Sequence, residues 1–85
     1  MSEMTLAELV AIIRECAGDS DVADLDGDVL DVTFEDLGYD SLAMLEAAGQ
    51  TQRRYAVTLV DDAVVEARTP REFLSLVNGE LTRVA

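Results

Sequence analysis

The chain has 85 residues and a formal net charge of −12, from 18 acidic residues against six arginines, and it contains no histidine. This length accommodates one small domain with a thin hydrophobic core. The missing histidine excludes Ser-His and Cys-His catalytic arrangements. The negative charge argues against nucleic acid or anionic membrane as partner and indicates either binding to basic protein surfaces or solubility alone.

The cysteine content and hydropathy indicate the compartment. Cys16 is the only cysteine, so no internal disulfide is possible. It falls on the apolar stripe of an expected helix, where we interpret it as a small buried hydrophobe rather than a reactive thiol. The sequence shows no signal peptide and no apolar run long enough to span a membrane. We therefore expect a cytoplasmic monomer.

The first expected helix covers about residues 5–17. Thr5 and Glu8 have the spacing of a capping box, and Gly18 suits a left-handed C-terminal cap. The residues predicted to form its apolar face are Leu6, Leu9, Val10, Ile13, Cys16 and Ala17.

Residues 19–39 form a long connection that is rich in aspartate. Thr33 and Asp36 are placed to cap a single helical turn within it. A calcium loop centred on Gly27 would need ligands at Val22 and Thr33, which cannot serve, so we expect a solvated acidic loop and no metal site. The apolar residues expected to anchor the connection are Val22, Leu25, Val29, Leu30, Val32, Phe34 and Leu37.

The second helix is predicted over residues 41–55, with Asp40 as its N-cap. The residues predicted for its apolar side are Leu42, Met44, Leu45 and Ala48. The apolar run 57–60 has no partner strand, so we interpret it as an extended connection.

A short helix is expected over residues 61–66 and a last helix over 70–83. Thr69 as N-cap, Pro70 at the first helical position and Glu72 in a capping box define the start of the last helix. The sequence therefore predicts an all-α four-helix bundle in one domain, 1–85, with three long helices, one short helix and a long first loop.

The segment 37–42, Leu-Gly-Tyr-Asp-Ser-Leu, holds the main candidate for chemistry. Gly38 permits an unusual turn, and capping by Asp40 would put Ser41 in the first helical turn. Free backbone N–H groups and the helix dipole favour an anion such as a phosphate there. With no base nearby, Ser41 is either a helix-start residue or the attachment point of a phosphodiester.

This segment resembles the phosphopantetheine attachment motif of acyl carrier proteins. Its Gly-Tyr-Asp-Ser-Leu form is most similar to carrier proteins of type II aromatic polyketide synthases, and the length, acidity and helix order extend the resemblance to the whole chain. It implies that Ser41 accepts 4′-phosphopantetheine from coenzyme A through a phosphopantetheinyl transferase, with support from Asp40. The chain would then be a non-catalytic carrier of malonyl units and growing polyketide thioesters in antibiotic biosynthesis.

The resemblance also implies partners and a docking surface. The partners would be a malonyl-transferring acyltransferase, a ketosynthase with its chain-length factor, a ketoreductase and cyclases. The candidate docking residues are Leu42, Glu46, Asp61, Asp62 and Glu66; for the acids, a merely solvated face is the alternative. The pair Arg53-Arg54 gives the far end of the second helix the opposite charge.

Three further positions are candidate cargo contacts. Gly49, beside two alanines, lies inside the second helix, where glycine costs about 1 kcal/mol relative to alanine. It either lets helices pack closely or leaves a cleft for an acyl chain. Arg71 and Asn78 share a face of the last helix and either bind carbonyls of an intermediate or point to water. A fatty acid carrier, a peptidyl carrier and an acidic helical adaptor without a prosthetic group remain alternative functions.

Overall fold

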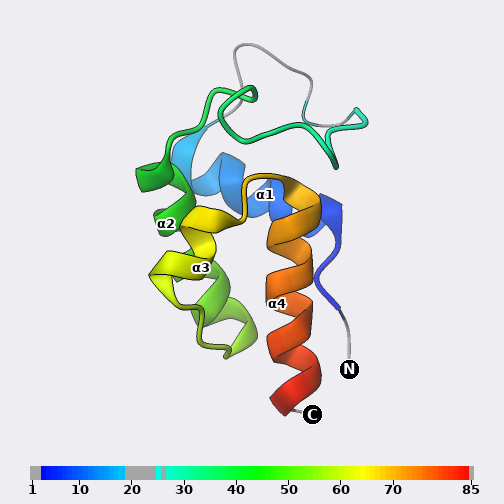
Figure 1. Ribbon diagram of the computed structural model, residues 1–85, viewed down its shortest axis with the longest axis vertical. Helices are drawn as coiled ribbons and strands as arrows, with labels where there is room; N and C mark the ends of the chain where they lie inside the picture. The colour runs from blue at the N-terminus through cyan, green and yellow to red at the C-terminus, as the bar shows by residue number, and fades with distance from the viewer. Residues whose placement is uncertain (1–2, 19–24, 26, 85) are drawn as a thin grey trace.

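The computed structural model describes residues 3–18, 25 and 27–84. It contains the helices α1 (Leu6–Ala17), α2 (Ser41–Tyr55), α3 (Asp61–Glu66) and α4 (Pro70–Val84), and no strand among the described residues. Helix α1 packs against α2 and α4, and α3 packs against both α2 and α4. Figure 1 shows the described part of the connection before α2, residues 27–40, at one end of this bundle. The expected all-α four-helix architecture is confirmed.

None of these helices combines the length and the apolar character needed to cross a bilayer, as far as the described residues go.

The helix starts follow from local hydrogen bonds. Thr5 caps α1, and both halves of its capping box with Glu8 are present. At α4 the Thr69 hydroxyl accepts from the Glu72 N–H at 3.2 Å, while the Glu72 carboxylate accepts from the Thr69 N–H at 3.1 Å. Each reciprocal pair satisfies two of the donors that a helix N-terminus leaves free.

The end of α1 differs from the expected left-handed cap. Gly18 has φ 80° and ψ −179°, so its φ is positive but its ψ lies far from the left-handed helical region. This conformation is essentially restricted to glycine. It turns the chain away from the helix in an extended direction, while the Gly18 N–H still bonds to the Arg14 carbonyl at 3.0 Å.

The apolar face of α1 is also rotated from the predicted one. Ile12, which was not assigned to that face, is fully buried, whereas Ala17 is exposed. Ile12 and Ile13 lie three and four residues after Leu9, so both are neighbours of Leu9 on the side that packs on the bundle. Ala17, in the last turn, lies beyond the packed surface.

In α2 the prediction for Leu42 was wrong as regards packing, because this side chain is 65% exposed. Successive helical residues are rotated by about 100°, so Leu42 lies about 200° from Met44, on the opposite side of the helix. The side that packs consists of Met44, Ala47, Ala48 and Thr51. Thr51 is fully buried and donates its hydroxyl to the Ala47 carbonyl at 2.8 Å, so no polar group there is left unpaired.

The long connection is anchored, as expected, by buried apolar side chains, namely Leu25, Val29, Phe34 and Leu37. Phe34 packs edge-on against Phe73 of α4, with ring centroids 6.2 Å apart. The Arg71 N–H donates to the Leu30 carbonyl at 2.9 Å, which ties the connection to α4. Val22 and most of the aspartate-rich stretch considered for calcium lie outside the described residues.

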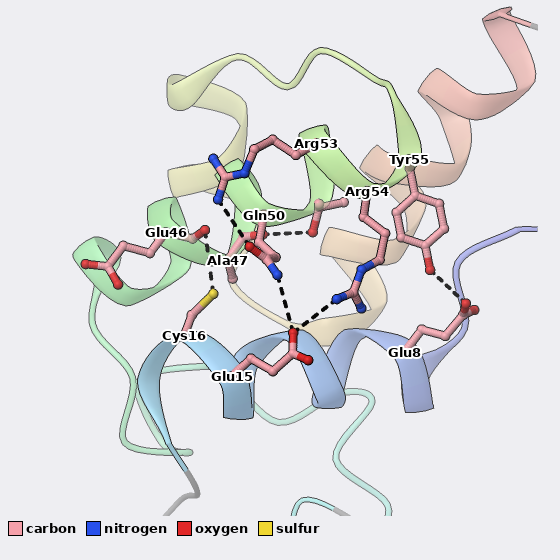
Figure 2. Close-up of polar contacts among 10 residues, drawn as sticks. Glu8, Glu15, Cys16, Glu46, Ala47, Gln50, Arg53, Arg54 and Tyr55 are labelled. Atoms are coloured by element: carbon pink, nitrogen blue, oxygen red, sulfur yellow. Dashed lines mark hydrogen bonds and ion pairs between the residues drawn. The ribbon is translucent and has the colours of Figure 1, made fainter.

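A polar seam joins α1 to α2 along their exposed edge (Figure 2). Arg54 pairs with Glu15 at 3.2 Å, and Gln50 donates to the same carboxylate at 3.4 Å. Tyr55 donates its hydroxyl to Glu8 at 2.8 Å. Burial, together with this hydrogen bond, raises the pKa of Tyr55 to about 12.

Candidate functional site

The turn that leads into α2 is built from backbone hydrogen bonds. The Leu37 N–H donates to the Thr33 carbonyl at 3.0 Å, and the Thr33 hydroxyl accepts from the Asp36 N–H at 3.1 Å, which is the expected capped single turn. Gly38 has φ 94°, a backbone conformation that side chains disfavour. Tyr39 is buried and donates its hydroxyl to the Gly18 carbonyl at 2.7 Å.

Asp40 and Ser41 follow this turn at the start of α2. Asp40 is the N-cap, and its carboxylate accepts from the Ala43 N–H at 2.9 Å. Ser41 is the first helical residue and is exposed, so its hydroxyl is open to solvent at the positive end of a 15-residue helix. An anion bonded to this oxygen would lie where the helix dipole favours negative charge.

An open hollow of about 810 Å³ lies beside Ser41. It is bounded by the turn before α2, by the first turn of α2, and by α3 with its connection to α4. Its apolar lining residues include Phe34, Met44 and Val64. This arrangement offers room next to Ser41 for a flexible covalent group, with both apolar and polar surface.

The five candidate docking residues all lie at the surface. Leu42 follows Ser41 directly, and Asp61, Asp62 and Glu66 are exposed on α3, which packs against α2. Figure 2 shows the Glu46 carboxylate pointing away from α1, while its backbone carbonyl faces the Cys16 thiol. The structure therefore brings acidic groups and one exposed leucine to the surface around Ser41 and α3.

Sequence reasoning missed three residues of this region. Val60 and Val65 are 63% and 50% exposed, at the N-cap and in the last turn of α3, and Val65 and Arg68 line the hollow beside Ser41. The signal for Val65 in the sequence was weak, since Val64 and Val65 are adjacent on a short helix and lie about 100° apart around its axis. Val64 takes the buried position.

The candidate cargo residues of α4 do not line that hollow. Arg71 binds Asp31 through two hydrogen bonds of 2.6 and 3.1 Å. The hydrogen bond from Arg71 lowers the pKa of Asp31. Asn78 accepts from the Met4 N–H at 2.7 Å and donates to the Met4 carbonyl at 3.1 Å. Both residues line a second, more open hollow of about 430 Å³ along α4, and each has a partner within the protein.

Gly49 lies apart from the hollow as well. A Cβ atom on Gly49 would meet only the Arg53 guanidinium, at 3.7 Å, so no neighbouring helix requires glycine there. The close packing of this stretch belongs to Ala47 and Ala48, which are buried.

Ser41 offers a hydroxyl group with few reactive side chains around it. Neither histidine nor lysine occurs in the chain, and the described residues contain no group of three or more His, Cys, Asp or Glu side chains that could hold a metal ion. Asp40, the nearest carboxylate in sequence, is engaged with the Ala43 N–H. The geometry suits a hydroxyl that another protein modifies.

Comparison with known proteins agrees with this arrangement. A family model described as a phosphopantetheine attachment site matches residues 7–77. The oxytetracycline polyketide synthase acyl carrier protein of Streptomyces rimosus is 50% identical over 82 residues, which cover 96% of this chain and 86% of that protein.

The chain is also similar to solved structures of acyl carrier proteins. The actinorhodin holo acyl carrier protein from S. coelicolor is 45% identical with a TM-score of 0.85, covering 99% of this chain and 98% of that one. Its 3,5-dioxohexyl form, described as a triketide mimic, is also 45% identical and has a TM-score of 0.89, with the same two coverages.

Proposed function

Because this chain belongs to the phosphopantetheine-attachment family, as an acyl carrier protein of the polyketide synthase kind, we propose that Ser41 bears the phosphopantetheine arm. Members of this family are carrier subunits rather than catalysts, and their prosthetic group is 4′-phosphopantetheine. When bound, this group supplies a terminal thiol that holds acyl groups as thioesters. The observation that carries the assignment to Ser41 is its exposed hydroxyl at the capped N-terminus of α2, beside an open hollow.

The residues around Ser41 fit such a group. Asp40 holds the first turn of α2 by accepting from the Ala43 N–H, so the Ser41 oxygen keeps one position at the helix end. In the transfer, the Ser41 oxygen forms a bond to the phosphorus of the phosphopantetheine half of coenzyme A. The bond to the nucleotide half breaks, and adenosine 3′,5′-bisphosphate leaves. We assign removal of the Ser41 proton to the transferase, since the neighbouring Asp40 carboxylate is engaged with the Ala43 N–H.

The cargo we propose is malonyl units and growing poly-β-keto intermediates of an aromatic, antibiotic-type pathway. The support is the similarity to the oxytetracycline carrier and to the actinorhodin carrier in its dioxohexyl form. The hollow beside Ser41, lined by Phe34, Met44 and Val64, provides apolar surface for such chains. A cargo role for Arg71 or Asn78 would first require their bonds to Asp31 and Met4 to break, so we assign the cargo to the Ser41 hollow.

A polyketide carrier interacts with the other proteins of its synthase. As specific partners we propose the phosphopantetheinyl transferase, the malonyl-transferring acyltransferase, the ketosynthase with its chain-length factor, and downstream ketoreductase and cyclases. Leu42 supplies an exposed apolar contact next to Ser41, and Glu46 with the α3 acids supplies negative charge. Such a surface steers association with basic patches on a partner.

Incubation with coenzyme A and a promiscuous transferase tests the assignment to Ser41. Intact mass should increase by one phosphopantetheine unit, and Ser41→Ala should abolish the increase. Ser75→Ala is the matched control, since Ser75 is also an exposed helical serine and should not affect modification. An unmodified wild type, or modification that persists in Ser41→Ala, would refute the proposal.

Reconstitution tests the cargo. The loaded protein should yield polyketide with an aromatic-type ketosynthase pair and malonyl-CoA. Failure with that pair, together with turnover by a fatty acid or peptide assembly system, would favour one of the alternative carriers. Partner binding that is unchanged by Ser41→Ala, in a protein that is never modified, would favour an adaptor without a prosthetic group.

A further inference from the structure

The connection between α3 and α4 places one cation at the hollow beside Ser41. Arg68 and Ser41 both line this hollow. The other charged lining residues are all acidic, namely Glu35, Asp36 and Asp40. Among the described residues that line the hollow, Arg68 is therefore the only one with a positive charge.

The backbone of Arg68 is fixed relative to the turn that presents Ser41. Its carbonyl accepts from the Phe34 N–H at 2.8 Å, and its N–H donates to Glu72 at 3.1 Å. The Phe34 carbonyl in turn accepts from the Tyr39 N–H at 2.9 Å, two residues before Ser41. In Figure 1 the connection that carries Arg68 runs from the end of α3 to the start of α4. The Arg68 side chain is exposed. Because its backbone is held in place and it lines the hollow, the guanidinium can extend over the hollow.

The Arg68 guanidinium also differs in its pairing from the other arginines whose side chains the structure describes. Partners exist for Arg14, Arg53, Arg54 and Arg71. No described residue binds the guanidinium of Arg68, although acidic side chains line the same hollow. Its five N–H donors are thus available, whereas the other arginine side chains that the structure describes are paired.

A phosphodiester on Ser41 would supply the missing partner. It adds one negative charge beside three carboxylates, which is unfavourable unless a cation compensates it. The planar fork of a guanidinium matches two phosphate oxygens and adds to the contribution of the helix dipole. We infer that Arg68 binds the phosphodiester that joins the arm to Ser41, an inference that rests on the proposed function. Arg68 thereby sets where the arm leaves the protein surface.

The experiment compares Arg68→Gln and Arg68→Lys with Arg53→Gln in the phosphopantetheinylated protein. Arg53→Gln changes the net charge equally, but Arg53 bonds to Gln50 and does not line the hollow. Intact mass first establishes modification of each protein. The ³¹P resonance of the phosphodiester and the ¹⁵N–¹H resonance of the Arg68 Nε, assigned by its loss in Arg68→Lys, are then recorded before and after modification.

On this inference the Arg68 Nε resonance moves on modification of the wild type, and less so at about 0.5 M salt. Arg68→Gln shifts the ³¹P resonance, Arg68→Lys shifts it less, and Arg53→Gln leaves it unchanged. The inference would be overturned if the Arg68 Nε resonance did not move on modification and the ³¹P resonance were the same in the wild type and in the Arg68 variants.

Two other results would also overturn the inference. A movement of the Nε resonance only after loading with a diketo acyl group would make Arg68 a cargo residue. Slower transfer to a partner enzyme with both resonances unmoved would make it a docking residue. Failure of the wild type to gain mass would instead refute the proposed function itself. If the transferase does not accept Arg68→Gln, the Nε resonance of the wild type still decides.

Discussion

Asn78→Ala is the most informative perturbation of the fold, because it separates a structural from a cargo role of this residue. The Asn78 amide makes two hydrogen bonds to the backbone of Met4, 74 residues away, and Met4 is only 2% exposed. Removal of the amide leaves a shielded N–H and a shielded carbonyl without partners. The N-terminal segment would then lose its polar attachment to α4.

The magnitude follows from these two bonds. The two bonds together contribute about 1–3 kcal/mol net, and the loss lies in the upper part of this range because the Met4 N–H and carbonyl are left unpaired, so we expect about 2–3 kcal/mol. A domain of this size has a total stability of roughly 4–13 kcal/mol. The melting temperature should therefore fall by about 10–20 °C.

Urea unfolding of the unmodified protein, followed by far-ultraviolet circular dichroism, measures this loss. Ser75→Ala, an exposed position on the same helix, is the control and should change stability by no more than about 0.5 kcal/mol. Amide exchange at Met4 should accelerate in Asn78→Ala and remain unchanged in the control. A stability change within about 0.5 kcal/mol, with an effect only after acyl loading, would refute the structural role and return Asn78 to the cargo residues.

Three further changes test other parts of the structure. Burial, together with the bond to Glu8, raises the pKa of Tyr55 from 10.0 to about 12, so the folded state holds this proton more tightly than the unfolded state. Between pH 10 and 12 the free energy of unfolding of the wild type should therefore fall by about 1–2 kcal/mol more than that of Tyr55→Phe, measured by urea midpoints. Equal losses in the two proteins would contradict the burial of Tyr55 and its bond to Glu8. Gly49→Ala should raise stability by about 0.5–1 kcal/mol in the same assay, because the added Cβ has room, whereas a loss would indicate close helix packing there. Glu46→Lys should slow association with a partner enzyme several-fold at low salt in stopped-flow measurements, and the effect should fade as salt rises; Glu3→Lys is the charge-matched control, and equal rates for the two would remove Glu46 from the docking surface.

Local spacing in the sequence was sufficient for the helix starts and for the turn before α2. A capping box joins residues three apart, so Thr5 with Glu8 and Thr69 with Glu72 can be read without knowledge of the fold. The same holds for Asp40, whose partner is the N–H three residues later. The position of Ser41 at a helix N-terminus follows from this local rule alone.

Tertiary structure alone decided which polar groups meet across the bundle. Asn78 finds its partner 74 residues away and Arg71 finds Asp31 40 residues away, and no local pattern encodes such pairs. The side that each helix turns toward its neighbours likewise decided that Ile12 is buried and Leu42 exposed, since an apolar residue is buried only where a neighbouring element covers it.

The sequence by itself therefore determined the helices, the N-terminal caps of α1, α2 and α4, and the serine at the start of α2, because these depend on hydrogen bonds within one turn. It did not determine the surroundings of that serine. The hollow is formed where segments 33–41 and 64–68 meet, and this meeting depends on the packing of α3 against α2 and on the bond from the Phe34 N–H to the Arg68 carbonyl. Long-range packing set these contacts, and with them the place of Arg68, the one cation among the described residues that line the hollow beside Ser41.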